Sequence, residues 1–381
     1  MTENRRKMLL DFADEQTLIP NTVKPLFDFW LRDTHITLAA DGNYYCTGTT
    51  RTEGEEAAFL FNDGIRVWKS PDLEDWEDLG LVWSFEKDGT WENKWYEEMG
   101  DWKEVPARDP RGRRALYAPE IYQIKGDFYI TASINWPKQR DGEESSCTFL
   151  LKSTTGKAEG PYVDCHGGPM SSRIDSSIFT DDDGTVYYLW QDGKIARMKD
   201  DMTGFAEPPC QMLQVEFDPE PYCEGVFMFK HDGFYHLCLA IWTMDEGGVA
   251  GYFPGSKEQK LSYDCVIATS KNIYGPYSKR YTSITGGGHN SFFTGKDGRF
   301  YATMFGNPVN ESFAPFYARP AVIEMEWDGE KVFPIRAWHK VDSPKEAILC
   351  QARFCMSRFS ASNRRIEFWI LSFSSRLTSN I

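Results

Sequence analysis

Four ionisable residues recur at the same position in four similar stretches of the sequence. Each stands nine positions before the glycine of an Asp-Gly pair; they are Asp33, Asp175, Glu224 and His289. Carboxyl groups brought together could perform acid–base chemistry, because one can donate a proton while another activates an attacking water. Three carboxylates crowded into one place cannot all be charged at low cost, so one should keep its proton to higher pH and serve as the acid.

The elements that carry these residues are predicted to be β-hairpins. In the clearest copy, 173–190, Asp175 enters an apolar run, a turn at Gly184 follows, and a second run rich in β-branched and aromatic residues returns. This pattern is typical of two antiparallel strands joined by a tight turn. A fifth copy contains Glu120, but its connection to the turn is one residue shorter. Glu120 therefore stands out of register, and we expect it to contact substrate rather than to join the catalytic set.

The hairpins predict a radial arrangement of sheets. Each hairpin is followed by a further strand pattern, so the chain consists of five similar all-strand units. Units of roughly fifty to eighty residues cannot each bury a core alone but can stack side by side, and radial repetition of four-stranded sheets gives a β-propeller. We predict an all-β, five-bladed propeller over 27–340, with a lead-in over 1–26 and an atypical tail over 341–381. Because inner strands line the axis, the four ionisable residues should meet there.

The sequence around these residues resembles glycoside hydrolase family 43. The motifs that carry the resemblance are Arg32-Asp33-Thr34, Ile174-Asp175-Ser176-Ser177, Glu224-Gly225-Val226, Ala118-Pro119-Glu120-Ile121 and Gly288-His289-Asn290-Ser291. In two motifs the chain departs from the family, since Thr34 and Val226 stand where proline is usual. These departures leave all three carboxylates in place but leave the subfamily, and hence the substrate, open.

The resemblance implies a glycosidase and a role for each acid. Glu224 is expected to be the general acid, Asp33 the base that activates water, and Asp175 the group that tunes the acid and holds the sugar. The expected reaction removes terminal arabinofuranosyl, xylosyl or galactosyl residues from plant-type polysaccharides or oligosaccharides, with inversion of configuration.

Two alternatives stay open at this point. One is a retaining fructosidase-like or phosphorolytic propeller enzyme, because other five-bladed families also use an Asp, Asp, Glu set or a phosphate nucleophile. The other is a non-catalytic carbohydrate-binding propeller, because fold does not imply function. The presence of all three acids favours an enzyme over the binding module.

Further residues are expected to bind substrate or an ion. Substrate contacts are predicted for His289, Glu120, Arg319 and Trp242. The resemblance also places His289 in the central channel near a calcium ion. Because calcium prefers oxygen ligands, a metal role for His289 would be indirect, through water; a histidine hydrogen-bonded to the carboxylates is the alternative. No cofactor is required, and a structural calcium ion in the channel is the one ion implied.

Composition limits the class of partner. The net charge of −15 and the pI near 5.0 argue against nucleic acid and anionic membranes, and favour a carbohydrate partner. The nine cysteines are scattered, which disfavours a disulfide framework and a zinc site. Asp11 and Asp14 interrupt the apolar run near the start, so the pattern is not that of a signal peptide. A cytoplasmic location is the default expectation, with export the alternative if the start is mis-set.

Overall fold

The apolar runs and Asp-Gly turns fold into antiparallel sheets in the computed structural model, which describes residues 24–50, 62–93, 116–135, 146–214, 223–244, 260–284, 287–305 and 319–335. The chain divides into two units, and the larger one spans residues 22–335. The other unit, 1–21 with 336–381, lies outside the described residues, as does the predicted tail over 341–381.

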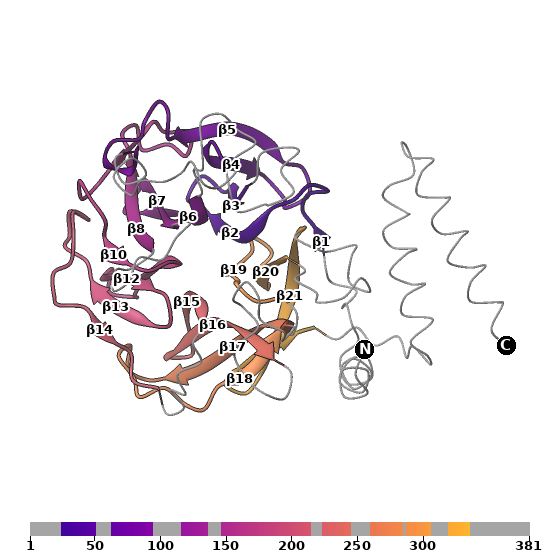
Figure 1. Ribbon diagram of the computed structural model, residues 1–381. Helices are drawn as coiled ribbons and strands as arrows, with labels where there is room; N and C mark the ends of the chain where they lie inside the picture. The colour runs from indigo at the N-terminus through magenta and orange to yellow at the C-terminus, as the bar shows by residue number, and fades with distance from the viewer. Residues whose placement is uncertain are drawn as a thin grey trace, which may run out of the picture. The chain divides into compact units, whose positions relative to one another are not determined.

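Five antiparallel sheets surround one axis, so the fold is the five-bladed β-propeller that the sequence predicts (Figure 1). Blade one consists of β2 (Arg32–Leu38), β3 (Tyr44–Thr49), β4 (Gly64–Ser70) and β5 (Glu77–Ser84). Blade two consists of β6 (Leu116–Ile124), β7 (Asp127–Asn135), β8 (Ser146–Ser153), β9 (Tyr162–Asp164) and β10 (Ser171–Ser172). Blade three consists of β11 (Ser176–Thr180), β12 (Val186–Trp190), β13 (Lys194–Arg197) and β14 (Cys210–Gln211).

The remaining two blades follow the same antiparallel plan. Blade four consists of β15 (Glu224–His231), β16 (Phe234–Met244), β17 (Lys260–Ser270) and β18 (Tyr281–Ile284). Blade five consists of β19 (Phe292–Thr294), β20 (Phe300–Phe305), β21 (Pro320–Asp328), β22 (Lys331–Pro334) and, from the start of the chain, β1 (Lys24–Pro25). The first strands of neighbouring blades contact one another, which places them nearest the axis. None of the described helical segments is long and apolar enough to cross a bilayer.

The core lies between adjacent blades. Ile65 and Val67 of β4 pack against Ile130 of β7 and Phe149 of β8 in one continuous cluster. Further clusters fill the spaces between blades two and three, three and four, and five and one. Because burial of these side chains supplies the main stabilisation, the angle between neighbouring blades, and with it the position of each inner strand, is fixed by packing.

The ring is closed by a strand from the start of the chain. β1 pairs antiparallel with β21, with Lys24 opposite Val322, and the Leu26 amide donates a hydrogen bond to the Pro320 carbonyl at 3.0 Å. The last residues of the predicted lead-in therefore belong to blade five. The blade is assembled from chain segments about 300 positions apart in the sequence, which prevents the ring from opening at the seam with blade one.

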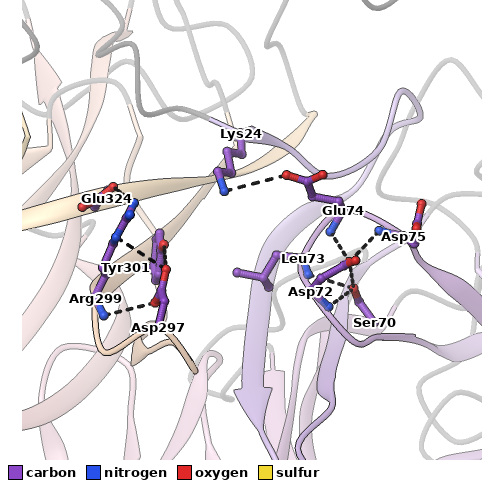
Figure 2. A network of polar contacts seen from close by, with 10 residues as sticks. All are labelled: Lys24, Ser70, Asp72, Leu73, Glu74, Asp75, Asp297, Arg299, Tyr301 and Glu324. Carbon is purple, nitrogen blue, oxygen red and sulfur yellow. Dashed lines mark hydrogen bonds and ion pairs between the residues drawn. The ribbon is translucent and has the colours of Figure 1, made fainter.

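Polar contacts also cross the seam between blades five and one. Figure 2 shows Lys24 of β1 reaching Glu74, which follows β4, at 4.0 Å, and both side chains are well exposed at 41% and 56%. A second contact is more buried: the Lys296 amide of blade five donates to the Tyr44 hydroxyl of blade one at 2.8 Å. The two contacts differ in burial, so they should differ in their contribution to stability.

We predict that Tyr44→Phe lowers the free energy of unfolding by about 1 kcal/mol, because it leaves the Lys296 amide without its acceptor while keeping the ring. Glu74→Gln should change it by less than about 0.5 kcal/mol, because exposed ion pairs contribute little. Urea unfolding of the full chain measures both. Equal losses in the two variants would contradict this ranking of the seam contacts.

Candidate active site

The inner strands begin at residues with left-handed backbone conformation. Asp33, Asp175 and His289 have φ angles of 52°, 59° and 63°, a conformation that is uncommon for residues other than glycine, although less so for aspartate, asparagine and histidine. In blade one the pairing register of β2 and β3 shifts between Arg32 and His35, so Asp33 lies on a β-bulge. Bulges re-aim side chains, and strained backbone of this kind persists only where the surrounding structure holds it.

Blade four departs from this pattern by one residue. Its left-handed residue is Gly225, with φ 61°, so Glu224 stands one position earlier than Asp33 does in blade one. The connection to the turn is shorter here: eight positions separate Gly225 from Gly233, whereas nine separate Asp33 from Gly42. The shared register predicted for Glu224 is therefore wrong by one residue. The charges of Asp175 and Asp33 nevertheless raise the pKa of the Glu224 carboxyl.

Gly225 is required at this position for a second reason. A Cβ atom built on it would lie 2.9 Å from Cγ of His289, which is closer than such atoms approach in proteins. The absence of a side chain at Gly225 therefore leaves room for the imidazole of His289, which enters from blade five. In blade four, Glu224 thus supplies a carboxyl group, and Gly225 leaves the space that the His289 ring occupies.

His289 joins the carboxylates of blades one and three. Its Nδ1 atom lies 3.3 Å from Oδ1 of Asp33 and 3.9 Å from Oδ2 of Asp175. The Gly225 amide donates a hydrogen bond to the same Asp175 oxygen at 2.9 Å. All three side chains are buried. The structure therefore brings together Asp33, Asp175 and His289, three of the four residues that the sequence predicted to meet at the axis.

Hydrogen bonds connect both aspartates to blade two, directly for Asp175 and through Thr49 of blade one for Asp33. The Thr49 hydroxyl donates to Oδ2 of Asp33 at 2.5 Å and accepts from the Ala118 amide of blade two at 2.7 Å. The Asp175 amide donates to the Ser133 hydroxyl of blade two at 2.8 Å. Because these contacts cross blade boundaries, the positions of both aspartates depend on the packing between blades.

Burial and mutual repulsion keep protons on the cluster. Burial, and then the Asp33 carboxylate, raise the pKa of Asp175 to about 7. Burial, and then the Asp175 carboxylate, raise the pKa of Glu224 to about 7, with a smaller contribution from Asp33. The charge of His289 and the hydrogen bond from Tyr263 act in the opposite direction on Glu224. A carboxyl with a pKa near neutrality can serve as a general acid.

Glu120 is a further buried carboxyl, with 4% of its surface exposed. The Tyr122 hydroxyl donates to its Oε2 atom and lies 2.9 Å from the Ser177 hydroxyl of blade three. Burial raises the pKa of Glu120 to about 8, with further contributions from Asp175 and Asp33. Glu120 is therefore protonated at neutral pH, within a polar network that joins blades two and three.

The residue before each left-handed position forms a second set around the site. In blades one to four this position is held by Arg32, Tyr117, Ile174 and Glu224. Each of them is partly exposed, whereas the left-handed residue that follows it is buried. The Arg32 guanidinium lies 4.9 Å from the centre of the Phe305 ring, and its charge lowers the pKa of Asp175. Sequence reasoning missed Arg32 and Tyr117, although counting from the bulge rather than from the turn would have found them.

Two predicted substrate residues lie at the ends of strands. Arg319 is partly exposed and directly precedes β21. Trp242 lies on β16, and its backbone pairs with that of Tyr263 on β17. The side chain of Trp242 is outside the described part of the structure, so its predicted contact with substrate stays a prediction.

Among the described residues, no group of three or more His, Cys, Asp or Glu side chains is arranged to hold a metal ion. Of the carboxylate oxygens near His289, Oδ2 of Asp175 accepts a hydrogen bond from the Gly225 amide, whereas Thr49 donates to the other oxygen of Asp33. A calcium ion held through water by His289 stays a prediction.

The protein is therefore a five-bladed propeller in which separate blades bring carboxyl groups of raised pKa together, an arrangement that acid–base cleavage of glycosides can use. The chain belongs to glycosyl hydrolases family 43, whose family model matches residues 22–332. Membership makes it a glycosidase that hydrolyses O-glycosyl bonds, as the resemblance of its motifs implied.

Similar proteins agree with this assignment. The chain is 26% identical over 306 residues to the β-D-galactofuranosidase xynD of Aspergillus niger, covering 76% of this chain and 77% of that protein. It is 23% identical over 327 residues to the extracellular exo-α-(1→5)-L-arabinofuranosidase ArbA of Cellvibrio japonicus, covering 74% and 82%. The α-L-arabinanase of Cellvibrio cellulosa has the same fold, with a TM-score of 0.56, 20% identity and coverage of 81% and 96%.

We predict that Glu120→Gln removes part of the pH dependence of stability. With its pKa raised to about 8 from an ordinary 4.5, Glu120 binds more protons in the folded state between these values, so stability falls as pH rises through that range. The effect is at most roughly 1.4 kcal/mol per pKa unit. Melting temperatures at pH 5 and pH 9 should therefore differ less in Glu120→Gln than in the wild type. The matched control is Glu77→Gln, because Glu77 is exposed. The same change in melting temperature between pH 5 and pH 9 in the wild type and in both variants would refute the assignment.

Proposed function

We propose that the protein removes terminal arabinofuranosyl, xylosyl or galactosyl residues from plant-type oligosaccharides or polysaccharides, with inversion of configuration. The observation that carries this proposal is the grouping of Asp33, Asp175 and Glu224 from separate blades, with the pKa of Glu224 raised to about 7. Two of the similar proteins are named for furanosides, a galactofuranosidase and an arabinofuranosidase. A terminal furanosyl unit is therefore the first substrate class to test.

The proposed reaction has one chemical step. Glu224 donates its proton to the glycosidic oxygen as the bond to the anomeric carbon breaks, which gives a neutral leaving group. On the opposite face, water attacks the anomeric carbon and transfers its proton to Asp33. The Thr49 hydroxyl, 2.5 Å from Asp33, orients the base toward that water. The two carboxyl groups exchange protonation states, and solvent resets them after the product leaves.

Asp175 is proposed to set the acidity and position of Glu224. Its carboxylate is the largest electrostatic cause of the raised pKa of Glu224, and it accepts the amide hydrogen of Gly225, the next residue in the chain. Asp175 is therefore proposed to raise the pKa of Glu224 through its charge and to fix the position of Glu224 through the hydrogen bond from the Gly225 amide.

Substrate contacts are proposed for two groups of residues. His289, Glu120, Arg319 and Trp242 keep their predicted roles, although the burial of Glu120 means that a contact would require its network to open. Arg32 and Tyr117 are added, because they share the partly exposed strand position of the acid. Arg32 supplies a fixed hydrogen-bond donor to a sugar hydroxyl, and Tyr117 an aromatic edge or face.

We predict that Glu224→Gln and Asp33→Asn respond differently to the leaving group. Glu224→Gln should lower kcat/KM by roughly 10²- to 10⁴-fold on oligosaccharides but much less on 2,4-dinitrophenyl glycosides, whose leaving group needs no proton. Asp33→Asn should be impaired on both, because each reaction needs an activated water. Circular dichroism checks that both variants fold. Near-normal rates on oligosaccharides in either variant would sink the assignment.

The stereochemical outcome is the second expected result. Proton NMR of the first-formed sugar, recorded before mutarotation with nitrophenyl arabinofuranoside, xyloside, galactofuranoside and galactoside as substrates, should show inverted configuration. Retention, or a covalent adduct on Asp33 trapped with a fluorinated sugar, would favour the fructosidase-like alternative. Binding of oligosaccharides without any turnover across a broad panel would favour the non-catalytic propeller.

A further inference from the structure

We propose that Tyr263 is a positioning residue for the general acid, holding one oxygen of the Glu224 carboxyl so that the other delivers the proton. This inference rests on the function proposed above. Its basis is a hydrogen bond in which the Tyr263 hydroxyl donates to Oε1 of Glu224 at 3.0 Å.

The tyrosine reaches the acid from two strands away. Glu224 on β15 pairs with Ala240 on β16, and Tyr263 lies on β17, where it pairs with Trp242. The small Ala240 side chain belongs to the same buried cluster as Tyr263, so the phenol ring can pass over the middle strand. A larger residue at position 240 would occupy the path of the ring.

Tyr263 is held in place by its side chain and its backbone. Its surface is 1% exposed, and its ring centre lies 6.3 Å from that of Phe305. Its carbonyl accepts the Gly288 amide at 2.8 Å, and Gly288 directly precedes His289. Tyr263 thus holds Glu224 with its hydroxyl, and with its backbone carbonyl it holds the segment of blade five that contains His289. Burial and the nearby carboxylates raise the pKa of Tyr263 well above its ordinary value, so the hydroxyl keeps its proton as a donor.

The direction of this hydrogen bond suits proton donation. A donor at Oε1 favours the protonated acid with its hydrogen on Oε2, because the carbonyl oxygen is the better acceptor. As the proton leaves, negative charge develops on the carboxyl, and hydrogen bonds to charged groups are stronger than those to neutral ones. Tyr263 therefore stabilises the acid more after proton transfer than before it, which is the condition for accelerating the step.

Burial raises the pKa of Glu224 most, and Asp175 and Asp33 raise it further, whereas His289 and Tyr263 lower it. Removal of the tyrosine hydroxyl removes one of the two groups named as lowering this pKa. The pKa of Glu224 should therefore rise in Tyr263→Phe, and the alkaline limb of the kcat/KM profile should move to higher pH.

The experiment compares Tyr263→Phe with Tyr277→Phe. Tyr277 is a matched control, because it is a fully buried tyrosine of the same part of the chain whose hydroxyl donates to the Ile273 carbonyl at 2.8 Å. We expect Tyr263→Phe to lose roughly 10- to 100-fold in kcat/KM on oligosaccharides. On 2,4-dinitrophenyl glycosides it should lose only a few-fold, because that leaving group needs little help from the acid. Tyr277→Phe should show no such dependence on the leaving group.

An independent readout uses no turnover. Carbon-13 NMR titration of the Glu224 carboxyl should show a higher pKa in Tyr263→Phe than in wild type and Tyr277→Phe. Equal losses on both substrate classes with an unshifted carboxyl titration would assign Tyr263 a purely structural role and overturn the inference, as would unchanged activity. If the wild type cleaves no glycoside, the proposed function fails, and the titration alone decides whether Tyr263 controls the Glu224 carboxyl.

Discussion

The site depends on a backbone conformation that is repeated around the axis. Asp33, Ala118, Asp175, Gly225 and His289 all have positive φ at the start of an inner strand. For most side chains this conformation is costly, and the amides of Ala118, Asp175 and Gly225 are each held by a hydrogen bond to the preceding blade. Packing between blades therefore holds the geometry of the catalytic groups, and a loss of packing would release the strain together with the site.

The same repetition explains what the sequence could reveal. Asp-Gly turns and alternating apolar runs are local signals, so the hairpins, the five blades and the convergence of Asp33, Asp175 and His289 could all be predicted. The register of Glu224 could not, because it depends on whether a connection contains one residue more or less. The contact of Tyr263 with Glu224 could not either, since it joins strands separated by a third and depends on the size of Ala240.

Electrostatics gives the buried cluster a graded protonation. Glu120 holds its proton most strongly, Asp175 and Glu224 titrate near neutrality, and each value is raised first by burial. Hydrogen bonds from Gly225 and Tyr263 limit the shift by stabilising the charged forms. The fold thus places four carboxyl groups close together without requiring all of them to be charged, which spares the interior the repulsion of four buried anions.

The closure of blade five by β1 has a consequence for how the protein is made. A ribosome releases the chain from its N-terminus, so Lys24 and Pro25 emerge long before their partners Val322 and Ala321. Blades one to four can pack in order as they appear, but the first strand must wait until nearly the whole ring has been synthesised. Because His289 also comes from the last blade, the nascent chain acquires a complete set of catalytic groups only when the ring closes, and it carries an unpaired strand until then.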